Sequence, residues 1–354
     1  MVACWYFICY NSTKQKQEEG KSMKKGRNLW LDLFKICMCW MIISIHFVWE
    51  SYFYHPIYRL AVPLFFAISG YFNYSTDTEK AAAGAITFIR RSFRYLLVGF
   101  AFYIVFDFIM CYVDGNGVGY YFTTLFYEDP LFEFFFLNRP ITYSGAQLWF
   151  LIALFVVSLV HYALLKFGKE KWYRYIVPAT LLIQLFFGGY MRLFQDTDMP
   201  IRYTRNAWFM GLPFFGMGYL LAQYDFHKKH WYKWLYLLLG ILFFLLQIPE
   251  HSIVKTEVYA STVPATAFLL LFFTGLPSPK AEFYYKWFGK SLSFYVYILH
   301  MAVGIVVGRL FTFRSLFVRS IVILLASIGI YEVCYLAGMG IRYLQRKRQK
   351  NAEI

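Results

Sequence analysis

Long apolar runs recur along this chain of 354 residues and are separated by short segments that carry most of its lysine and arginine. A helix needs about 20 apolar residues to cross a hydrocarbon core of about 30 Å, because each residue adds about 1.5 Å. We therefore predict an all-α, polytopic integral membrane protein with about ten transmembrane helices, at residues 29–50, 57–74, 93–113, 146–166, 173–190, 206–223, 232–248, 258–275, 290–310 and 318–341.

Composition supports this interpretation and removes others. With 59% hydrophobic and 16% charged residues, the chain does not have the surface of a water-soluble enzyme, a disordered tail or a secreted disulfide scaffold. In a soluble protein the net charge of +15 would favour a nucleic-acid partner, but here the basic residues lie between apolar runs. The predicted partner is thus the lipid bilayer, with no nucleic acid. The six cysteines show no paired metal spacing, and no metal is expected.

The distribution of lysine and arginine predicts the orientation. With the N-terminus inside, 25 of these residues fall in cytoplasmic segments and 9 on the opposite side. Both termini are therefore predicted to be cytoplasmic, in a multi-pass protein of the cell (cytoplasmic) membrane. We divide the chain into a flexible cytoplasmic extension (1–26), a ten-helix membrane domain (27–342) and a basic cytoplasmic tail (343–354). The longest connection, 114–145, is expected to fold over the membrane surface.

Ionisable residues within the first apolar run need a partner or a function. Asp32 and Lys35 share one helical face and are interpreted as an interfacial ion pair. His46 lies about 21 Å beyond Asp32 along the helix, and Glu50 follows His46 by one turn. A carboxylate beside an imidazole can orient it to take a proton, so His46 and Glu50 are candidate catalytic residues. The alternative is an interfacial histidine with a glutamate that reaches water.

The second run reads RLAVPLFFAISGYF from Arg59 to Phe72. Pro63 is expected to interrupt the helix, while Ser69 and Gly70 would let another backbone approach closely. Arg59 lies at the outer end of this run, where its cation could lower the pKa of Glu50 or bind an anionic group of a substrate. Packing of small residues alone would also explain Ser69 and Gly70.

Three further groups are candidates for binding. Arg91 and Arg94 lie three residues apart at the start of the third run, and their planar guanidinium groups suit the phosphates of a cytoplasmic donor. The positive-inside rule alone would also account for them. Arg205 places a second cation at the outer surface. His300 lies near the middle of the ninth run with Tyr297 one turn earlier, a spacing that a structural histidine–tyrosine hydrogen bond would also explain.

In order along the chain, these motifs resemble the membrane acyltransferases of acyltransferase family 3, a group that includes polysaccharide and peptidoglycan O-acetyltransferases and the membrane part of vancomycin-resistance serine racemases. The resemblance extends from about Arg27 to Arg342 and rests on RNLWLDLFK with His46, RLAVPLFFAISGYF, Arg91-x-x-Arg94, QLWFL, TRN and YILH. It implies an acyl-CoA donor, an essential His46, and acyl-CoA phosphate contacts at Arg91 and Arg94. Unlike some relatives, this chain carries neither a hydrolase-like nor a racemase domain.

The sequence thus predicts an acyl-CoA-dependent O-acyltransferase that moves an acyl group to a hydroxyl of a cell-surface glycan or related envelope acceptor. Acetyl is the leading candidate for that acyl group. Arg59, Arg205, Tyr297 and His300 are candidates for contacting that acceptor or a developing oxyanion. Direct transfer and transfer through an acyl-histidine intermediate are both open as reaction routes. A homodimer is a further possible assembly of this chain. The alternative is a transporter of a small amino acid or glycan, in which His46, Glu50 and His300 would relay protons.

Overall fold

The structure is a computed structural model that describes residues 28–47, 54–115, 129–195, 199–224, 232–277, 279, 282–289 and 291–352. Throughout these residues the regular elements are helices and none is a strand, as predicted. Apolar surroundings favour this outcome because a helix satisfies its backbone hydrogen bonds within one segment. Within the described residues, six helical segments are long and apolar enough to cross a membrane: Leu29–Phe47, Thr78–Val113, Ala146–Lys166, Tyr232–Ile253, Leu292–Leu310 and Leu316–Ile341. The other four predicted spans coincide with shorter helices, so the count of ten and the cytoplasmic termini stay predictions.

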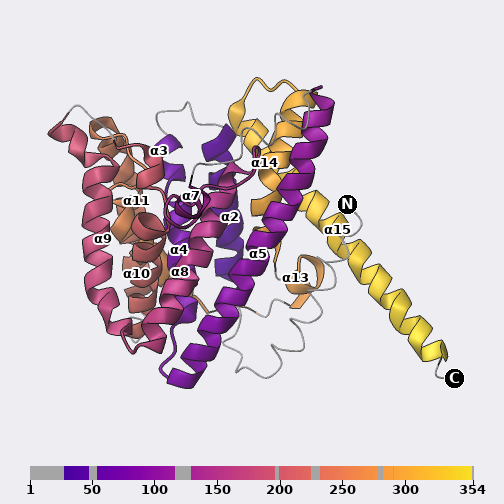
Figure 1. Cartoon of the computed structure of the whole chain (residues 1–354), viewed down its shortest axis with the longest axis horizontal. Coiled ribbons are helices and arrows are strands. Elements are labelled where there is room, and N and C mark those ends of the chain that lie inside the picture. The colour runs from indigo at the N-terminus through magenta and orange to yellow at the C-terminus, as the bar shows by residue number, and fades with distance from the viewer. Residues whose placement is uncertain are drawn as a thin grey trace. The chain divides into compact units, whose positions relative to one another are not determined.

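The chain packs as two compact units, Met1–Val48 with Pro277–Ile354 (unit 1) and Trp49–Leu276 (unit 2). Unit 1 contains helices that come from both ends of the chain (Figure 1): α2 (Leu29–Phe47), α13 (Glu282–Trp287), α14 (Leu292–Leu310) and α15 (Leu316–Ala352). Helices α2, α14 and α15 contact one another pairwise. The Cys39 thiol donates to the Ser293 carbonyl at 3.3 Å, and the Trp40 indole N–H donates to the Ser320 hydroxyl at 3.0 Å. These polar contacts hold α2 in register with both partners.

Unit 2 has more elements. Its α-helices are α3 (Tyr54–Tyr58), α4 (Ala61–Asn73), α5 (Thr78–Val113), α7 (Pro130–Phe135), α8 (Trp149–Lys166), α9 (Tyr173–Gly188), α10 (Leu212–Tyr224), α11 (Tyr232–Ile253) and α12 (Thr262–Gly275). Shorter turns of 3₁₀ helix connect them: η2 (Ala146–Leu148), η3 (Glu170–Trp172), η4 (Tyr190–Leu193) and η5 (Ile201–Tyr203). A π-helical turn, η6 (Ala207–Gly211), leads directly into α10.

Helix α5 is much longer than the predicted third span, because the segment before that span is helical too. The Asp77 side chain caps the helix by accepting from the backbone N–H groups of Glu79 and Lys80. Its apolar part, from Tyr95 to Val113, is about 28 Å long at 1.5 Å per residue, and Asp107 is the only Asp, Glu, Lys, Arg or His in it. Arg91 and Arg94 therefore lie directly at one end of the stretch that can cross a membrane.

The second predicted span is interrupted, but Pro63 is not the cause. Helix α3 ends at Tyr58, a turn at Arg59 and Leu60 follows, and α4 begins at Ala61. Pro63 thus lies in the first turn of α4, where a backbone N–H has no partner within the helix anyway. The expectation that Pro63 breaks the helix was wrong, and the break before Ala61 instead places Arg59 outside the regular helix.

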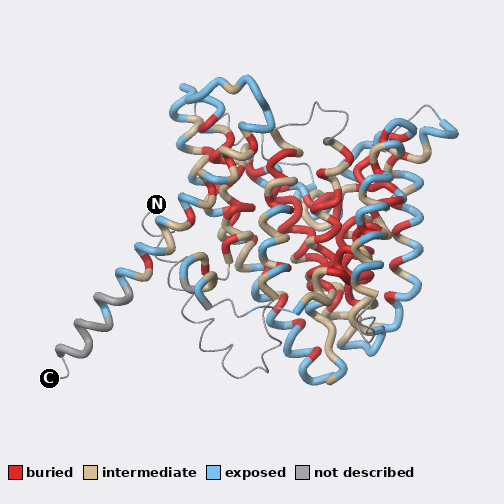
Figure 2. The backbone as a smooth tube through the Cα atoms, turned by 180° about the vertical axis from the view of Figure 1, so that it is seen from behind, coloured by how far each residue is buried: buried red, intermediate tan, exposed pale blue. Residues whose placement is uncertain are grey.

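The core of unit 2 lies where α4 packs against α10 (Figure 2). Most residues of α4, α8 and the first two turns of α10 are buried. A Cβ atom at Gly70 would overlap the carbonyl oxygen of Phe215, and one at Gly218 would overlap that of Ala67. Two backbones therefore touch at this crossing, which confirms the close approach predicted for Gly70.

The described part of the long connection, residues 129–145, packs on unit 2. Asn138, whose φ is 54°, accepts a hydrogen bond from the Ala207 backbone N–H and donates one to the Phe134 carbonyl. The buried Asp107 carboxylate accepts from the backbone N–H groups of Tyr143 and Ser144 at 2.8 and 3.0 Å. This segment is therefore tied to α5 and to the π-helical turn.

The backbone contact between α4 and α10 makes a direct prediction. Gly70→Ala and Gly218→Ala should each lower the melting temperature of the purified protein in detergent, because overpacking typically costs about 1–3 kcal/mol. Gly84→Ala is the matched control, since a Cβ at that helical position meets nothing within 4 Å. Equal melting temperatures for all three variants would contradict the packing described.

Candidate functional site

Two histidines from opposite ends of the chain lie together in unit 1. His46 is in the last turn of α2 and His300 is near the middle of α14, and their ring centroids are 5.5 Å apart with the planes tilted by 35°. His46 is half-buried, whereas His300 is 1% exposed. The structure therefore brings the predicted catalytic residue His46 into contact with His300, a predicted substrate-binding residue.

The hydrogen bonding of His300 determines which of its nitrogens carries the proton. Nδ1 lies 2.5 Å from the backbone carbonyl oxygen of Tyr297, and a carbonyl can only accept. Nδ1 must therefore hold the hydrogen, and Nε2 of the neutral ring keeps a lone pair. That Nε2 atom is buried and has no hydrogen-bond partner among the described residues. The expected contact with Tyr297 exists, but it uses the main chain rather than the phenol.

Close packing of α2 and α14 holds the two histidines together. One turn beyond His300, a Cβ atom at Gly304 would overlap the ring of Phe47, the residue next to His46. The Arg319 guanidinium of α15 also lies over the Phe47 ring, 5.1 Å from its centroid. A side chain at position 304 would push Phe47 away and separate the rings.

The interpretation of Asp32 and Lys35 as an ion pair is confirmed. Lys35 Nζ lies 3.0 Å from Asp32 Oδ1, and the Tyr285 hydroxyl donates to Asp32 Oδ2 at 2.8 Å. The pair thus ties α13 to α2 within unit 1. Glu50, the predicted orienting carboxylate for His46, lies outside the described residues, so this assignment stays a prediction.

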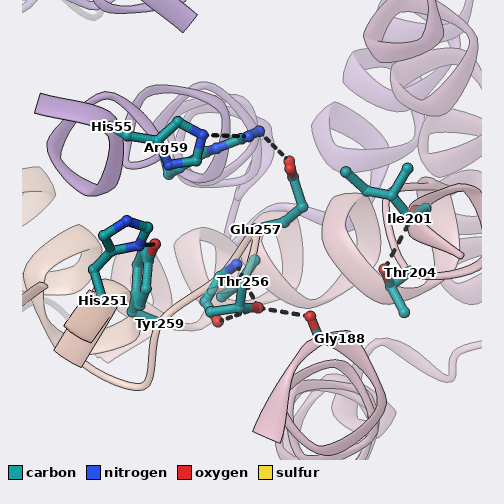
Figure 3. Close-up of polar contacts among 10 residues, drawn as sticks. His55, Arg59, Gly188, Ile201, Thr204, His251, Thr256, Glu257 and Tyr259 are labelled. Atoms are coloured by element: carbon teal, nitrogen blue, oxygen red, sulfur yellow. Dashed lines mark hydrogen bonds and ion pairs between the residues drawn. The ribbon is translucent and has the colours of Figure 1, made fainter. Parts of the chain in front are cut away.

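The second polar cluster is in unit 2 and is centred on Arg59 (Figure 3). Arg59 Nη1 lies 2.5 Å from Glu257 Oε2, and Arg59 Nη2 lies 3.0 Å from His55 Nε2. The ring of His55 lies 5.5 Å from that of His251, whose Nδ1 is 2.7 Å from the Tyr259 hydroxyl. We call these five residues the Arg59 cluster. It joins α3, the turn before α4, the end of α11 and the segment that follows it.

The segment that supplies Glu257 is held at several points. The Glu250 carboxylate accepts from the backbone N–H groups of Ala260 and Ser261, at 2.7 and 3.1 Å, and from the Ser261 hydroxyl. The Thr256 hydroxyl donates to the Gly188 carbonyl at 2.8 Å. A loop with this many anchors positions its side chains before any ligand arrives.

The remaining predicted cations have different surroundings. Arg91 is exposed and Arg94 is half-buried, and neither makes an ion pair or hydrogen bond with another described residue. Arg205 lies over the indole ring of Trp149, 5.5 Å from its centroid. The donors of Arg91 and Arg94 are therefore not used by another described side chain, whereas Arg205 is engaged by an aromatic ring. Among the residues that the structure describes, no three His, Cys, Asp or Glu side chains are placed to hold a metal ion.

Sequence reasoning missed four members of the Arg59 cluster, namely His55, His251, Glu257 and Tyr259. Only His55 carried a local signal, because it precedes Arg59 by four residues, about one helical turn. Glu257 is 198 residues from Arg59 in the chain, so nothing near Arg59 points to it. The sequence suggested that the Arg59 cation acts on Glu50 or on an anionic group of a substrate, and the structure adds that a buried carboxylate, that of Glu257, pairs with it.

The fold and these clusters define an all-helical, multi-pass membrane protein with an imidazole pair in one unit and a buried ionic cluster in the other. The family model described as an acyltransferase domain matches residues 28–339, nearly the whole chain. The chain belongs to acyltransferase family 3, which confirms the resemblance read from its motifs. No curated protein and no solved structure matches it.

The position of His55 predicts a dependence of stability on pH. Burial, and then the charge of Arg59, lower the pKa of His55 from 6.5 to about 4. As the pH falls below 6.5 the unfolded chain takes up a proton at this ring before the folded chain does, so stability present above pH 6.5 is lost progressively towards pH 4. The melting temperature of the wild type should fall more steeply across this range than that of His55→Gln. Parallel curves for the two proteins would contradict a lowered pKa.

Proposed function

We propose that this protein transfers an acyl group from cytoplasmic acyl-CoA to a hydroxyl group of a cell-surface glycan, with acetyl as the leading candidate for the acyl group. The observation that carries the proposal is the contact between His46 and His300 within a chain of acyltransferase family 3. The half-buried His46 imidazole can act as a base that a substrate can reach, and the buried, neutral His300 imidazole beside it holds it in position. A positioned base of this kind accelerates acyl transfer to a hydroxyl.

The proposed reaction is a substitution at the thioester carbonyl. His46 takes the proton of the acceptor hydroxyl as its oxygen attacks the carbonyl carbon. A carbon–oxygen bond forms, the carbon–sulfur bond breaks, and the proton passes from His46 to the departing sulfur to give free CoA. The products are an ester and a thiol, and nothing is oxidised or reduced. A positioned general base of this kind typically contributes about 10²–10⁴-fold to the rate.

His300 acts in this scheme as a positioning residue. Its Nδ1–H is bonded to the Tyr297 carbonyl, so Nε2 offers a lone pair in the buried region beside His46. A positive charge develops on His46 when it takes the proton, and an electron-rich neighbour stabilises that charge. Tyr297 contributes through its backbone carbonyl, which sets the tautomer of His300.

Arg91 and Arg94 are the proposed contacts for the phosphates of the donor. They lie at the boundary of the apolar part of α5, and ion pairs within the described residues do not use up their charge. Their separation of three residues places both on one face of the helix, where two guanidinium groups can hold neighbouring phosphates. Arg59 and Arg205 remain candidates for contacting the acceptor.

Calorimetry of acetyl-CoA binding to the purified protein separates the two proposed roles. Arg91→Ala/Arg94→Ala should weaken binding by about two to four orders of magnitude, because each contact between charged groups is worth about 1.5–3 kcal/mol. His46→Ala should bind acetyl-CoA about as well as the wild type but lose transfer and donor hydrolysis.

Lys80→Ala/Arg174→Ala is the matched control for charge. It likewise removes two cations from unit 2, here both exposed, and donor affinity should stay near that of the wild type. If the well-folded wild type bound no acetyl-CoA, or if the control lost as much affinity as the Arg91 and Arg94 double variant, the donor site would be refuted.

The role of His300 is tested by His300→Asn. The asparagine amide can still donate to the Tyr297 carbonyl, but it removes the lone pair of Nε2 beside His46. The variant should fold normally and bind acetyl-CoA like the wild type, while kcat falls at least about tenfold, equivalent to about 1.4 kcal/mol. Unchanged turnover would show that His300 only fills space next to His46.

A further inference from the structure

The Arg59 cluster contains two buried hydrogen-bond donors that lack an acceptor. Arg59 can only donate, so His55 Nε2 must accept its hydrogen bond, and the proton of the neutral His55 ring is then on Nδ1. His55 Nδ1 and Arg59 Nε are both buried, and neither has a hydrogen-bond partner within the described residues. Buried donors of this kind are rare, because leaving one unpaired costs about 1–3 kcal/mol. Among the unpartnered buried atoms of the described residues, these two lie on side chains that are hydrogen-bonded to each other, so acceptor oxygens placed here would satisfy both.

The charges of the cluster restrict what that molecule can be. The Glu257 carboxylate already neutralises the Arg59 guanidinium, and their side chains are only 9% and 13% exposed. His55 is neutral at physiological pH, because its pKa is lowered to about 4. An anionic ligand would add an uncompensated charge next to Glu257, and a buried charge without a partner is strongly unfavourable. An uncharged ligand with hydroxyl or carbonyl oxygens introduces no such charge.

The cluster is also rigid in the manner of a binding site. Glu250 holds the segment at Ala260 and Ser261, and Thr256 fixes it to the end of α9. A Cβ atom at Gly189 would lie 2.6 Å from Thr256 Cβ, so glycine is needed for this approach. The backbone that carries Glu257 is therefore held in place before a ligand arrives, which reduces the entropy lost on binding.

We propose that His55, Arg59 and Glu257 form a binding site for an uncharged, hydroxyl-bearing ligand and that this site selects neutral over anionic acceptors. Ligand oxygens accept from Arg59 Nε–H and His55 Nδ1–H, and ligand hydroxyls donate to Glu257. This assignment rests on the proposed function, because it identifies where part of the acceptor is recognised. It replaces the simpler expectation that Arg59 binds an anionic group.

Matched pairs of small sugars test the site without any turnover. The probes are the methyl glycosides of glucose, galactose and mannose, each compared with the corresponding uronic acid, which differs by a carboxylate. Saturation-transfer NMR on the full-length protein in detergent should show the neutral member of at least one pair binding about tenfold more tightly than the acid. His55→Phe, which keeps a ring but removes the donor, should weaken that binding roughly threefold to tenfold.

Glu257→Gln provides the sharpest variant. The amide oxygen can still accept from Arg59, but the guanidinium is no longer neutralised, so the preference should move by about tenfold or more towards the uronic acid. Glu133→Gln is the matched control, since Glu133 pairs with Arg139 elsewhere in unit 2 at 3.8 Å. This control should leave the preference unchanged. Melting temperatures of all variants establish that each is folded.

The outcomes separate this site from the proposed function. If neutral sugars bind and this binding responds to His55→Phe and Glu257→Gln as expected, the site is supported. The site then stands even if the protein never consumes acetyl-CoA, a result that would refute the proposed function. If the protein turns over acetyl-CoA but these substitutions do not change sugar binding, the proposed function is supported and the proposed site is wrong. If no probe binds, or if acids bind better to the wild type, the two donors serve ordered water and the proposal is wrong.

Discussion

The ion pair of Arg59 and Glu257 is the interaction around which one end of unit 2 is organised. Each partner loses hydration on burial, and the Coulombic attraction offsets that loss best when the geometry is good and the remaining polar atoms are hydrogen-bonded. Of the Arg59 nitrogens, Nε is buried without such a partner among the described residues. His55 accepts one of the Arg59 donors, and the anchors around Glu250 and Thr256 keep Glu257 within reach. The break between α3 and α4 belongs to the same arrangement, because it places Arg59 in a turn.

The same constraint explains the polar contacts of unit 1. Asp32 is paired with Lys35 and Tyr285, and His300 bonds to a carbonyl one turn earlier in its own helix. Several buried polar atoms of unit 1 lack a hydrogen-bond partner among the described residues, and one of them, His300 Nε2, belongs to the ring beside His46. An atom in that state is unfavourable for folding and useful for chemistry, which is why we assign the function to this pair rather than to Asp32 and Lys35. A buried donor or acceptor that no neighbour uses needs an explanation, and a reactive site is one such explanation.

Prediction from sequence succeeded where a feature depends on neighbours along the chain. The apolar runs predicted the helices because helix length and hydropathy are local properties, and the pairing of Asp32 with Lys35 followed from a spacing of three residues. The small residue Gly70 correctly indicated a close backbone contact. Pro63 misled because its effect depends on where the helix begins, and a proline in the first turn interrupts nothing.

The sequence by itself determined that this is an all-helical membrane protein, which motifs it shares with its family, and which histidine and arginines are candidates for its chemistry. Only the tertiary structure decided that His300 lies beside His46 and that Glu257 neutralises Arg59. The reason is physical. A side chain's charge and hydrogen-bonding capacity belong to its type, but whether they are already used depends on residues about 200 or more positions away that packing brings into contact.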